Sequence, residues 1–261
     1  MPPSNPTVDL AAACLIVLSI PVSIVAGWSA YKLLRTGLPP SRVPDLGIPL
    51  NEVSVFLLSM ALLVLAAGPL VYPASVILTI AFLLLCKTDL RQLWNFERND
   101  LRTSPGLAVT VYLAALPLVG LLLLLSLAVG SHFGWPMESQ KPVQMFLQAR
   151  SPMVIAGIIL LACVLAPVAE ELLFRGFLYP WLKGRIGRTP ALALTSLAFG
   201  LAHLHWSSFL SLAFFGLVLN LVYDQTGKLA HSMALHATFN LVTCGMLLLY
   251  KFSTPGGIIG P

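Results

Sequence analysis

The sequence predicts an all-α fold, a polytopic transmembrane helical bundle of about eight spans. Hydrophobic residues make up 57% of the 261 residues and charged residues only 10%, whereas a soluble domain carries about 25% charge. The mean hydropathy is +0.88. Apolar runs approaching the roughly 20 residues that a helix needs to cross a bilayer recur along the whole chain.

Eight apolar segments are predicted as spans, and the third and sixth are short enough to indicate broken or tilted helices. The first nine residues contain no Lys or Arg, so we expect the first segment to be a retained span and not a signal peptide. The segments are Val8–Leu34, Val53–Val71, Ala74–Cys86, Pro105–Val129, Pro152–Tyr179, Pro190–His203, Ser207–Tyr223 and Leu229–Tyr250.

The basic residues between these segments predict an orientation. With both termini on the non-cytoplasmic side, eleven Lys and Arg residues fall in one set of loops and three in the other. Cytoplasmic loops are the ones enriched in Lys and Arg. The net charge of +5 is then explained by topology and by contact with anionic lipid. No basic stripe with interleaved aromatics occurs, so no nucleic-acid partner is expected.

The polar segment Arg91–Arg102 divides the chain into two regions. Residues 1–104 form an N-terminal region of about three spans with almost no buried ionisable groups. Residues 105–261 contain every candidate for chemistry. The four cysteines show no metal-ligand spacing and are interpreted as small buried hydrophobes.

The most informative motif is a pair of adjacent carboxylates, Glu170 and Glu171, in the middle of an apolar segment. An ionised side chain costs about 2.5–3.5 kcal/mol inside a membrane. Glu171 and Arg175 are four residues apart and share a helix face. We therefore expect Arg175 to neutralise Glu171 and to leave Glu170 facing the bundle interior as a general base. The alternative is an ion-pair network that only fixes helix packing.

Two later spans carry polar residues at the same spacing. Phe199 and His203 lie four residues apart at the end of the sixth span, and His236 and Asn240 lie four apart in the last. Each pair alone could be a helix-end residue or interhelical glue. Together the three motifs indicate a functional site, because intramembrane ionisable groups usually serve chemistry or ion transfer. We interpret His231 as interfacial, and Asn220 has no predicted partner.

The three motifs, Glu170-Glu171-x-x-x-Arg175, Phe199-x-x-x-His203 and His236-x-x-x-Asn240, resemble in this order the CPBP family of intramembrane proteases. This family is also called the CAAX prenyl protease 2, Rce1-like or Abi family. The resemblance covers about residues 152–250 and leaves residues 1–104 as a variable part. It implies an eight-span fold with a polar cavity opening to the cytoplasmic side.

The resemblance also implies roles. Glu170 and His203 would activate water, His236 and Asn240 would stabilise the oxyanion, and the supporting residues would be Glu171, Arg175 and Phe199. We expect no cofactor, because the zinc signature HExxH is absent. The alternative is a metalloprotease in which Glu170, His203 and His236 bind zinc.

The predicted activity is hydrolysis of a peptide bond in a membrane-embedded or lipidated protein, such as a prenylated CAAX-type protein. The predicted location is the plasma (inner) membrane. Two alternatives use the same buried residues. One is a non-catalytic membrane scaffold or bacteriocin-immunity protein. The other is a proton-coupled transporter, which inverted repeats would favour, but no internal repeat is seen.

Overall fold

The structure is a computed structural model that describes residues 14, 17, 19–26, 28, 37–66, 70–97, 99–135 and 139–253. All regular secondary structure in these residues is helical. The predicted first span, Val8–Leu34, falls largely outside the described residues. Helical residues within it lie beside the middle of the chain, because Ser23 Oγ donates to the backbone oxygen of Leu113 at 3.3 Å.

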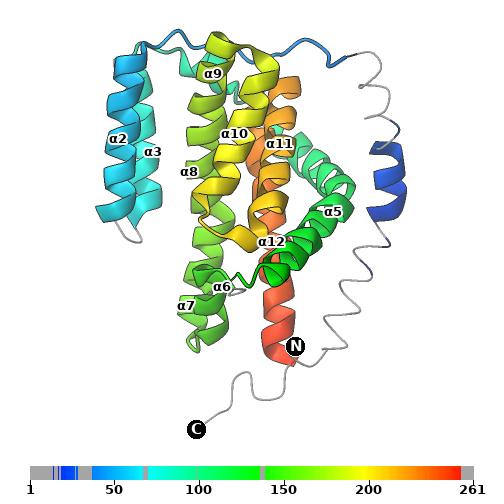
Figure 1. The fold of residues 1–261 in the computed structure, drawn as a ribbon. Helices are drawn as coiled ribbons and strands as arrows, with labels where there is room; N and C mark the ends of the chain where they lie inside the picture. Colours follow the sequence, from blue (N-terminus) through cyan, green and yellow to red (C-terminus); the bar gives the residue numbers. More distant parts are fainter. Residues whose placement is uncertain are drawn as a thin grey trace.

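The helices are arranged as a bundle around one long helix (Figure 1). In chain order they are α2 (Leu50–Ala66), α3 (Val71–Leu85), α4 (Leu90–Trp94), α5 (Asp100–His132), α6 (Lys141–Gln148), α7 (Pro152–Leu160), α8 (Ala166–Leu173), α9 (Tyr179–Ile186), α10 (Arg188–Ala202), α11 (Phe209–Thr226) and α12 (Leu229–Ser253). The α2–α3 hairpin packs on one side of α8, and α10, α11, α12 and the oblique α5 form the other side (Figure 1).

Four helical segments in the described residues are long and apolar enough to cross a membrane: Arg102–His132, Pro152–Ile186, Trp206–Thr226 and Leu229–Ser253. This composition is that of an integral membrane protein. Three other predicted spans are shorter helices. With 17, 15 and 15 residues and a rise of 1.5 Å per residue, α2, α3 and α10 reach about 22–26 Å, less than the roughly 30 Å hydrocarbon core. The arrangement of eight full spans therefore stays a prediction.

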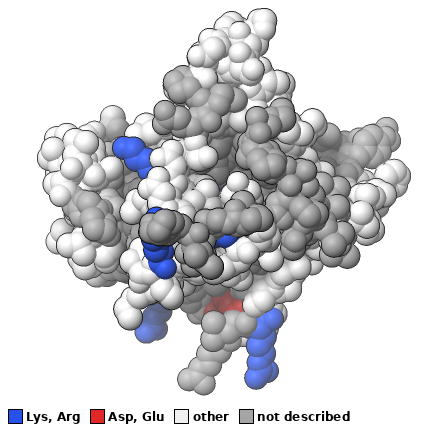
Figure 2. Space-filling model, turned by 90° about the horizontal axis from the view of Figure 1, so that it is seen from below, with Lys and Arg blue, Asp and Glu red and all other residues white. Residues whose placement is uncertain are grey.

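Charged side chains are sparse at the end of the bundle where α7 lies. Seen from there, the described surface shows scattered Lys and Arg side chains and little acidic surface (Figure 2). One cation of this end is buried: Lys251 Nζ donates to the backbone oxygen of Leu147 at 2.6 Å and thereby holds the end of α6 against α12. The charged group of Lys251 therefore contributes to helix packing and not to the charge of the surface.

The long helix from Pro152 to Ile186 contains two π-helical segments, η2 (Leu161–Leu165) and η3 (Phe174–Leu178). A proline follows each one, Pro167 after η2 and Pro180 after η3. Proline lacks the backbone N–H and clashes with the carbonyl four residues earlier. A π-helical turn accommodates this defect and leaves carbonyls for other donors. The backbone oxygen of Gly176 in η3 accepts from the Trp94 indole at 3.4 Å.

The extended segment of residues 37–49, called the strap below, ties the N-terminal region to the end of the long helix. Leu46 N donates to the oxygen of Pro180 at 3.2 Å, and the Trp181 indole donates to the oxygen of Ile48 at 3.0 Å. Lys183 pairs with Asp45 at 2.6 Å. The residues before 104 are therefore joined to the later helices by many polar contacts.

Two hydrophobic clusters form the core on either side of the long helix. One contains the rings of Phe56, Phe82 and Phe177, whose centroids lie 4.4–5.4 Å apart and join the α2–α3 hairpin to η3. The other lies between α5, α10, α11 and α12 and includes the buried Phe199 and Phe215. The two clusters pack on either side of the long helix. They thereby fix the position of the helix face that carries the two carboxylates.

Candidate active site

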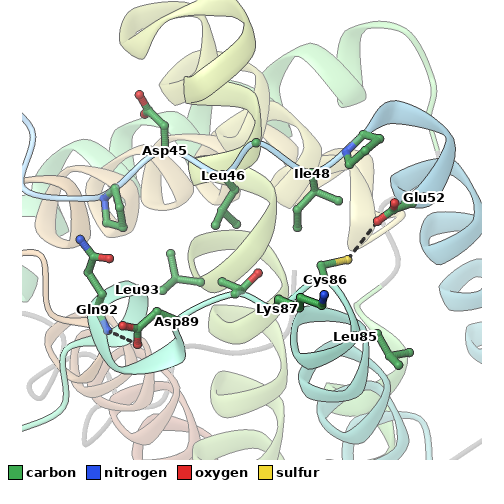
Figure 3. A pocket seen from close by; sticks show the side chains of 14 residues that line it. Asp45, Leu46, Ile48, Glu52, Leu85, Cys86, Lys87, Asp89, Gln92 and Leu93 are labelled. Carbon is green, nitrogen blue, oxygen red and sulfur yellow. Dashed lines mark hydrogen bonds between the residues drawn. The ribbon is translucent and has the colours of Figure 1, made fainter.

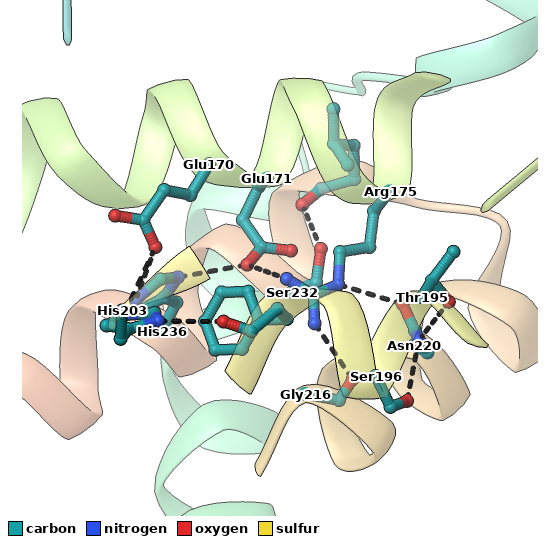
Figure 4. A network of polar contacts seen from close by, with 12 residues as sticks. Glu170, Glu171, Arg175, Thr195, Ser196, His203, Gly216, Asn220, Ser232 and His236 are labelled. Atoms are coloured by element: carbon teal, nitrogen blue, oxygen red, sulfur yellow. Dashed lines mark hydrogen bonds and ion pairs between the residues drawn. The ribbon is translucent and has the colours of Figure 1, made fainter. Parts of the chain in front are cut away.

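The two adjacent carboxylates of α8 have different surroundings (Figure 4). The Glu171 side chain is fully buried, whereas 22% of the Glu170 side chain is exposed. Successive residues on a helix point about 100° apart, so only one of the two faces the inside of the polar network. The predicted pairing of Glu171 with Arg175 is confirmed, whereas Glu170, which was expected to face the bundle interior, is partly exposed.

Glu171 is paired as its spacing from Arg175 predicts. Glu171 Oε1 accepts from Arg175 Nη1 at 2.9 Å and from His236 Nδ1 at 2.9 Å. Glu171 therefore joins its own helix to α12. The desolvation of these charges is offset only because each has a close partner.

Arg175 is held by three further contacts that the sequence did not predict. Its Nε donates to Asn220 Oδ1 at 3.0 Å, and its Nη2 donates to the oxygen of Gly216 at 2.8 Å. The guanidinium carbon lies 4.6 Å from the centre of the Phe199 ring, a cation–π contact. Asn220 is in turn fixed by the Thr195 hydroxyl, at 2.7 Å from its Nδ2. Asn220 thus acts as a positioning residue for Arg175.

Both histidines hold their Nδ1 proton on a fixed acceptor. His203 Nδ1 lies 2.8 Å from the backbone oxygen of Phe199, and His236 Nδ1 lies 2.9 Å from Glu171 Oε1. A carbonyl and a carboxylate only accept hydrogen bonds, so each Nδ1 is assigned as the donor. Each neutral ring then presents the lone pair of Nε2 to the site.

The two Nε2 atoms converge on one oxygen of Glu170. Glu170 Oε2 lies 3.9 Å from His203 Nε2 and 3.8 Å from His236 Nε2. These distances are too long for hydrogen bonds, and this buried oxygen has no hydrogen-bond partner among the described residues. A buried acceptor without a partner is costly. Three polar atoms from three side chains therefore converge at the site, and the acceptor Glu170 Oε2 has no donor among the described residues.

Close packing of α10 on α11 brings His203 to this position. A Cβ on Gly200 would lie 3.0 Å from the Ala213 backbone nitrogen, and one on Gly216 would lie 3.1 Å from the Phe199 ring. The Phe199 ring contacts both imidazoles, with centroid distances of 4.9 Å to His203 and 5.6 Å to His236. Phe199 therefore positions both histidines.

Asn240 lies one turn beyond His236 on α12, and its contact is with the helix that carries the carboxylates. Asn240 Nδ2 donates to the oxygen of Ala162 in η2 at 2.7 Å. No contact described here joins Asn240 to Glu170, His203 or His236. One amide hydrogen of Asn240 is thus already used to hold α12 against η2.

Two other residues have surroundings that the sequence did not indicate. His231 is buried, and its Nε2 lies 3.5 Å from Thr103 Oγ1 and 4.0 Å from Asp100 Oδ1; its interfacial position stays a prediction. Tyr72, at the start of α3, is close enough to Glu170 to interact electrostatically with it. The N-terminal region therefore contributes a polar side chain near the site, and no spacing in the sequence indicated this.

A pocket of the described residues lies away from Glu170. It has a volume of about 500 Å³ and is lined by the strap, the start of α2, the end of α3 and α4 (Figure 3). Leu46 of its wall binds Pro180, which lies ten residues after Glu170, or about 15 Å along the helix axis. A second pocket of about 120 Å³ lies at the α10–α11 turn. Neither pocket includes Glu170.

The residues of the site do not fit a closed zinc site as they stand. Zinc bonds of about 2.0–2.2 Å place tetrahedral ligand atoms roughly 3.4 Å apart, less than the 3.8 and 3.9 Å measured here. Among the described residues, no group of three His, Cys, Asp or Glu side chains has the geometry of a metal site. The fixed Nδ1 protons would suit zinc-bound histidines, but they equally suit acid–base catalysis.

Fold and site together define the class: an integral membrane protein of helices with a buried Glu–His site. Residues 152–242 match the family model described as type II CAAX prenyl endopeptidase Rce1-like. Residues 152–242 are thus similar to an Rce1-like domain, which is consistent with the CPBP/CAAX protease family that the three motifs resemble. Neither the curated proteins nor the solved structures gave a match.

Proposed function

We propose that the protein is an intramembrane endopeptidase that hydrolyses a peptide bond of a membrane-embedded or lipidated protein. The observation that supports this most directly is the convergence of two imidazole Nε2 atoms on the unpartnered Oε2 of Glu170. Peptide hydrolysis needs a base for water and donors for an oxyanion. The match to an Rce1-like family model supports the same class of reaction.

In the proposed mechanism, Glu170 and His203 hold the attacking water. A water between Glu170 Oε2 and His203 Nε2 can bridge the 3.9 Å gap with two hydrogen bonds. Glu170 takes a proton as the oxygen attacks the peptide carbonyl. The proton then passes to the leaving amine.

His236 supplies positive charge to the oxyanion when its Nε2 is protonated. The charges of Glu171 and Arg175 cancel each other, so the cluster has one net negative charge when Glu170 is ionised. Glu171 behind the His236 ring stabilises the imidazolium, as a carboxylate does in a catalytic triad. The second amide hydrogen of Asn240 is the further oxyanion donor in this proposal.

The proposal includes the finer topology. A cavity open to the cytoplasmic side would admit the substrate to Glu170, and both termini would lie on the opposite side. Prenylated CAAX-type proteins are the first substrates to test, since the family description names that class. The mechanism uses no metal ion.

The test is cleavage of a fluorogenic prenylated CAAX-type peptide by full-length protein in nanodiscs. Wild type, Glu170→Ala and chelator-treated wild type are compared, with Glu97→Gln as the matched control. Glu97 is a carboxylate of a different polar cluster, 2.8 Å from Lys228 Nζ. Loss of cleavage only in Glu170→Ala supports the proposal.

Cleavage by Glu170→Ala at the wild-type rate would show the mechanism to be wrong. Loss on chelation with recovery in Zn²⁺ would replace it by a zinc mechanism with Glu170, His203 and His236 as ligands. If wild type does not cut the prenylated peptide, an unprenylated membrane-anchored peptide is tested next. Failure on both would remove the support for a protease.

A further inference from the structure

Two thiols connect the helices that carry the site. Cys163 Sγ lies 3.8 Å from Cys244 Sγ, although the residues are 81 positions apart in the chain. Both cysteines are free. Cys163 lies in η2 of the helix that carries Glu170, and Cys244 lies in α12, which carries His236. This pair plays no part in the proposed reaction.

The thiol pair belongs to a row of contacts that includes the site. His236, Asn240 and Cys244 are spaced by four residues, so they follow one another along one face of α12. His236 contacts Glu171 at 2.9 Å, Asn240 contacts the oxygen of Ala162 at 2.7 Å, and Cys244 contacts Cys163 at 3.8 Å. The same face of α12 therefore fixes both the thiols and the catalytic histidine against the long helix.

We propose that Cys163 and Cys244 are an oxidation site whose disulfide form inactivates the enzyme. In this step each thiol loses its hydrogen, one S–S bond forms, and two electrons and two protons pass to the oxidant. A lipid-soluble quinone, reduced to the quinol, is the class of oxidant that suits a pair within apolar helices. A dithiol reductant reverses the step. The effect on activity rests on the proposed function, whereas formation of the bond does not.

The geometry explains why the bond would disturb the site. A disulfide has a sulfur–sulfur length of about 2.05 Å, so the two sulfurs must approach by roughly 1.8 Å. One turn away, Asn240 already contacts Ala162 at hydrogen-bond distance, so the helices cannot simply move closer there. Any part of the approach that side-chain rotation does not supply requires the helices to tilt or rotate, which changes the 3.8 Å separation between Glu170 and His236. A displacement of about 1 Å at an active site can cost about 100-fold in rate.

The experiment uses full-length protein in nanodiscs oxidised with diamide or with a short-chain quinone. The disulfide is identified as a linked peptide by mass spectrometry without reduction, and free thiols are counted with a maleimide reagent. The Cys14→Ser/Cys86→Ser double variant retains only the pair. We expect it and wild type to form the Cys163–Cys244 link and to lose at least tenfold in cleavage rate, with recovery in dithiothreitol.

Cys163→Ser and Cys244→Ser are the matched controls, because each removes one sulfur and leaves other oxidisable groups in place. We expect both to keep their cleavage rate after oxidation. Absence of the linked peptide from both reactions, with Cys163 and Cys244 still reactive to maleimide, overturns the proposal. A linked protein that cleaves at the reduced rate overturns the inactivation. A protein that links but cuts no peptide before oxidation points to failure of the proposed function, while the oxidation site stands.

Discussion

Two of the buried ionic clusters in the described residues are made of similar residues, and they differ in how completely their atoms are paired. In the first, every carboxylate oxygen of Asp224 has a donor. Tyr179 donates to one oxygen, and Arg188 and Gln225 donate to the other, with Arg188 Nε and Gln225 Nε2 at 2.9 and 2.8 Å. In the second cluster, Glu170 Oε2 and Glu171 Oε2 are both buried with no hydrogen-bond partner among the described residues.

The difference separates a structural ion cluster from a reactive one. Both oxygens of the buried Asp224 carboxylate accept hydrogen bonds, so neither is left unused. The function of this carboxylate is to hold α9, α10 and α11 together. A buried oxygen without a donor costs stability, and such a cost persists where the chemistry uses the atom. The comparison therefore predicts that neutralising Glu170 lowers the rate of cleavage, whereas neutralising Asp224 lowers stability.

The largest expected effect is on cleavage by Glu170→Gln. Loss of a general base costs about 10²–10⁴-fold, and we expect a fall of about 10³-fold. Stability should change by no more than about 0.5 kcal/mol, as for residues outside a hydrogen-bond network. Peptide cleavage and thermal unfolding of the same sample measure both. A variant that unfolds but, where folded, cuts normally would reverse the assignment of the two clusters.

Arg175→Ala should have the largest effect on stability. It leaves Glu171 as a buried charge without its partner, and breaking a buried pair costs about 3–5 kcal/mol. Arg175→Lys is the control, since lysine keeps the charge but not the planar donors that contact Glu171, Asn220 and Gly216. We expect the melting temperature to be highest for wild type, lower for Arg175→Lys and lowest for Arg175→Ala. Equal melting of wild type and the Ala variant would contradict the network.

Asp224→Asn should reduce stability and leave the reaction intact. Loss of charge-assisted bonds to Arg188 and Tyr179 costs about 1–3 kcal/mol, while the rate per folded molecule should stay within about twofold. Asp45→Asn is the matched control, because Asp45 is 63% exposed in its pair with Lys183 and such pairs contribute about 0–1 kcal/mol. A loss of rate in Asp224→Asn without unfolding would link this cluster to catalysis.

The smallest expected effects are on the pH dependence of stability. They concern a third ionic cluster, formed by Glu97, Asp100 and Lys228. Burial would raise the pKa of Asp100, but the hydrogen bonds from Lys228 Nζ and from the backbone of Glu97 lower it below its ordinary value. Hydrogen bonds to Asp100 and Glu97 raise the pKa of Lys228 above its ordinary value. Folding thus favours the ionised form of both groups.

The direction in which stability changes with pH follows from the linkage between protonation and folding. The contribution of Asp100 is present above the unfolded pKa of about 3.9 and is lost as pH falls further. That of Lys228 is present below about 10.4 and is lost as pH rises beyond it. We expect melting temperatures to be level between these limits. Asp100→Asn should flatten the acid decrease and Lys228→Met the alkaline one, and unchanged profiles in both would contradict the assignment.

Helical spacing in the sequence was sufficient to predict which side chains meet within one helix. The pairing of Glu171 with Arg175, four residues apart, follows from periodicity and is confirmed. The roles of Glu170, His203, His236 and Asn240 in catalysis stay predictions. The integral membrane class followed from composition, because length and hydropathy alone decide it.

What the sequence could not predict depends on contacts between distant residues. Asn220 contacts Arg175 from 45 positions away, and a single Asn in an apolar helix has no spacing signal. The π-helical turns before Pro167 and Pro180 and the strap likewise have no periodicity. Apolar length predicted eight spans, whereas four helical segments of the described residues are long and apolar enough to cross a membrane, so the other spans stay predictions.

The contacts of the strap affect where the chain can be cut to give a fragment that folds. The matched domain begins at residue 152, yet Arg42 N donates to the oxygen of Asp224 at 2.9 Å and Lys183 Nζ to the oxygen of Val43 at 2.7 Å. A fragment cut at the domain boundary would lose these donors and acceptors, along with the Trp94 indole on Gly176. We therefore expect that the boundary drawn by sequence similarity is not a boundary of autonomous folding. Exchange of the first hundred residues between relatives would require a matching surface on α9 and α11.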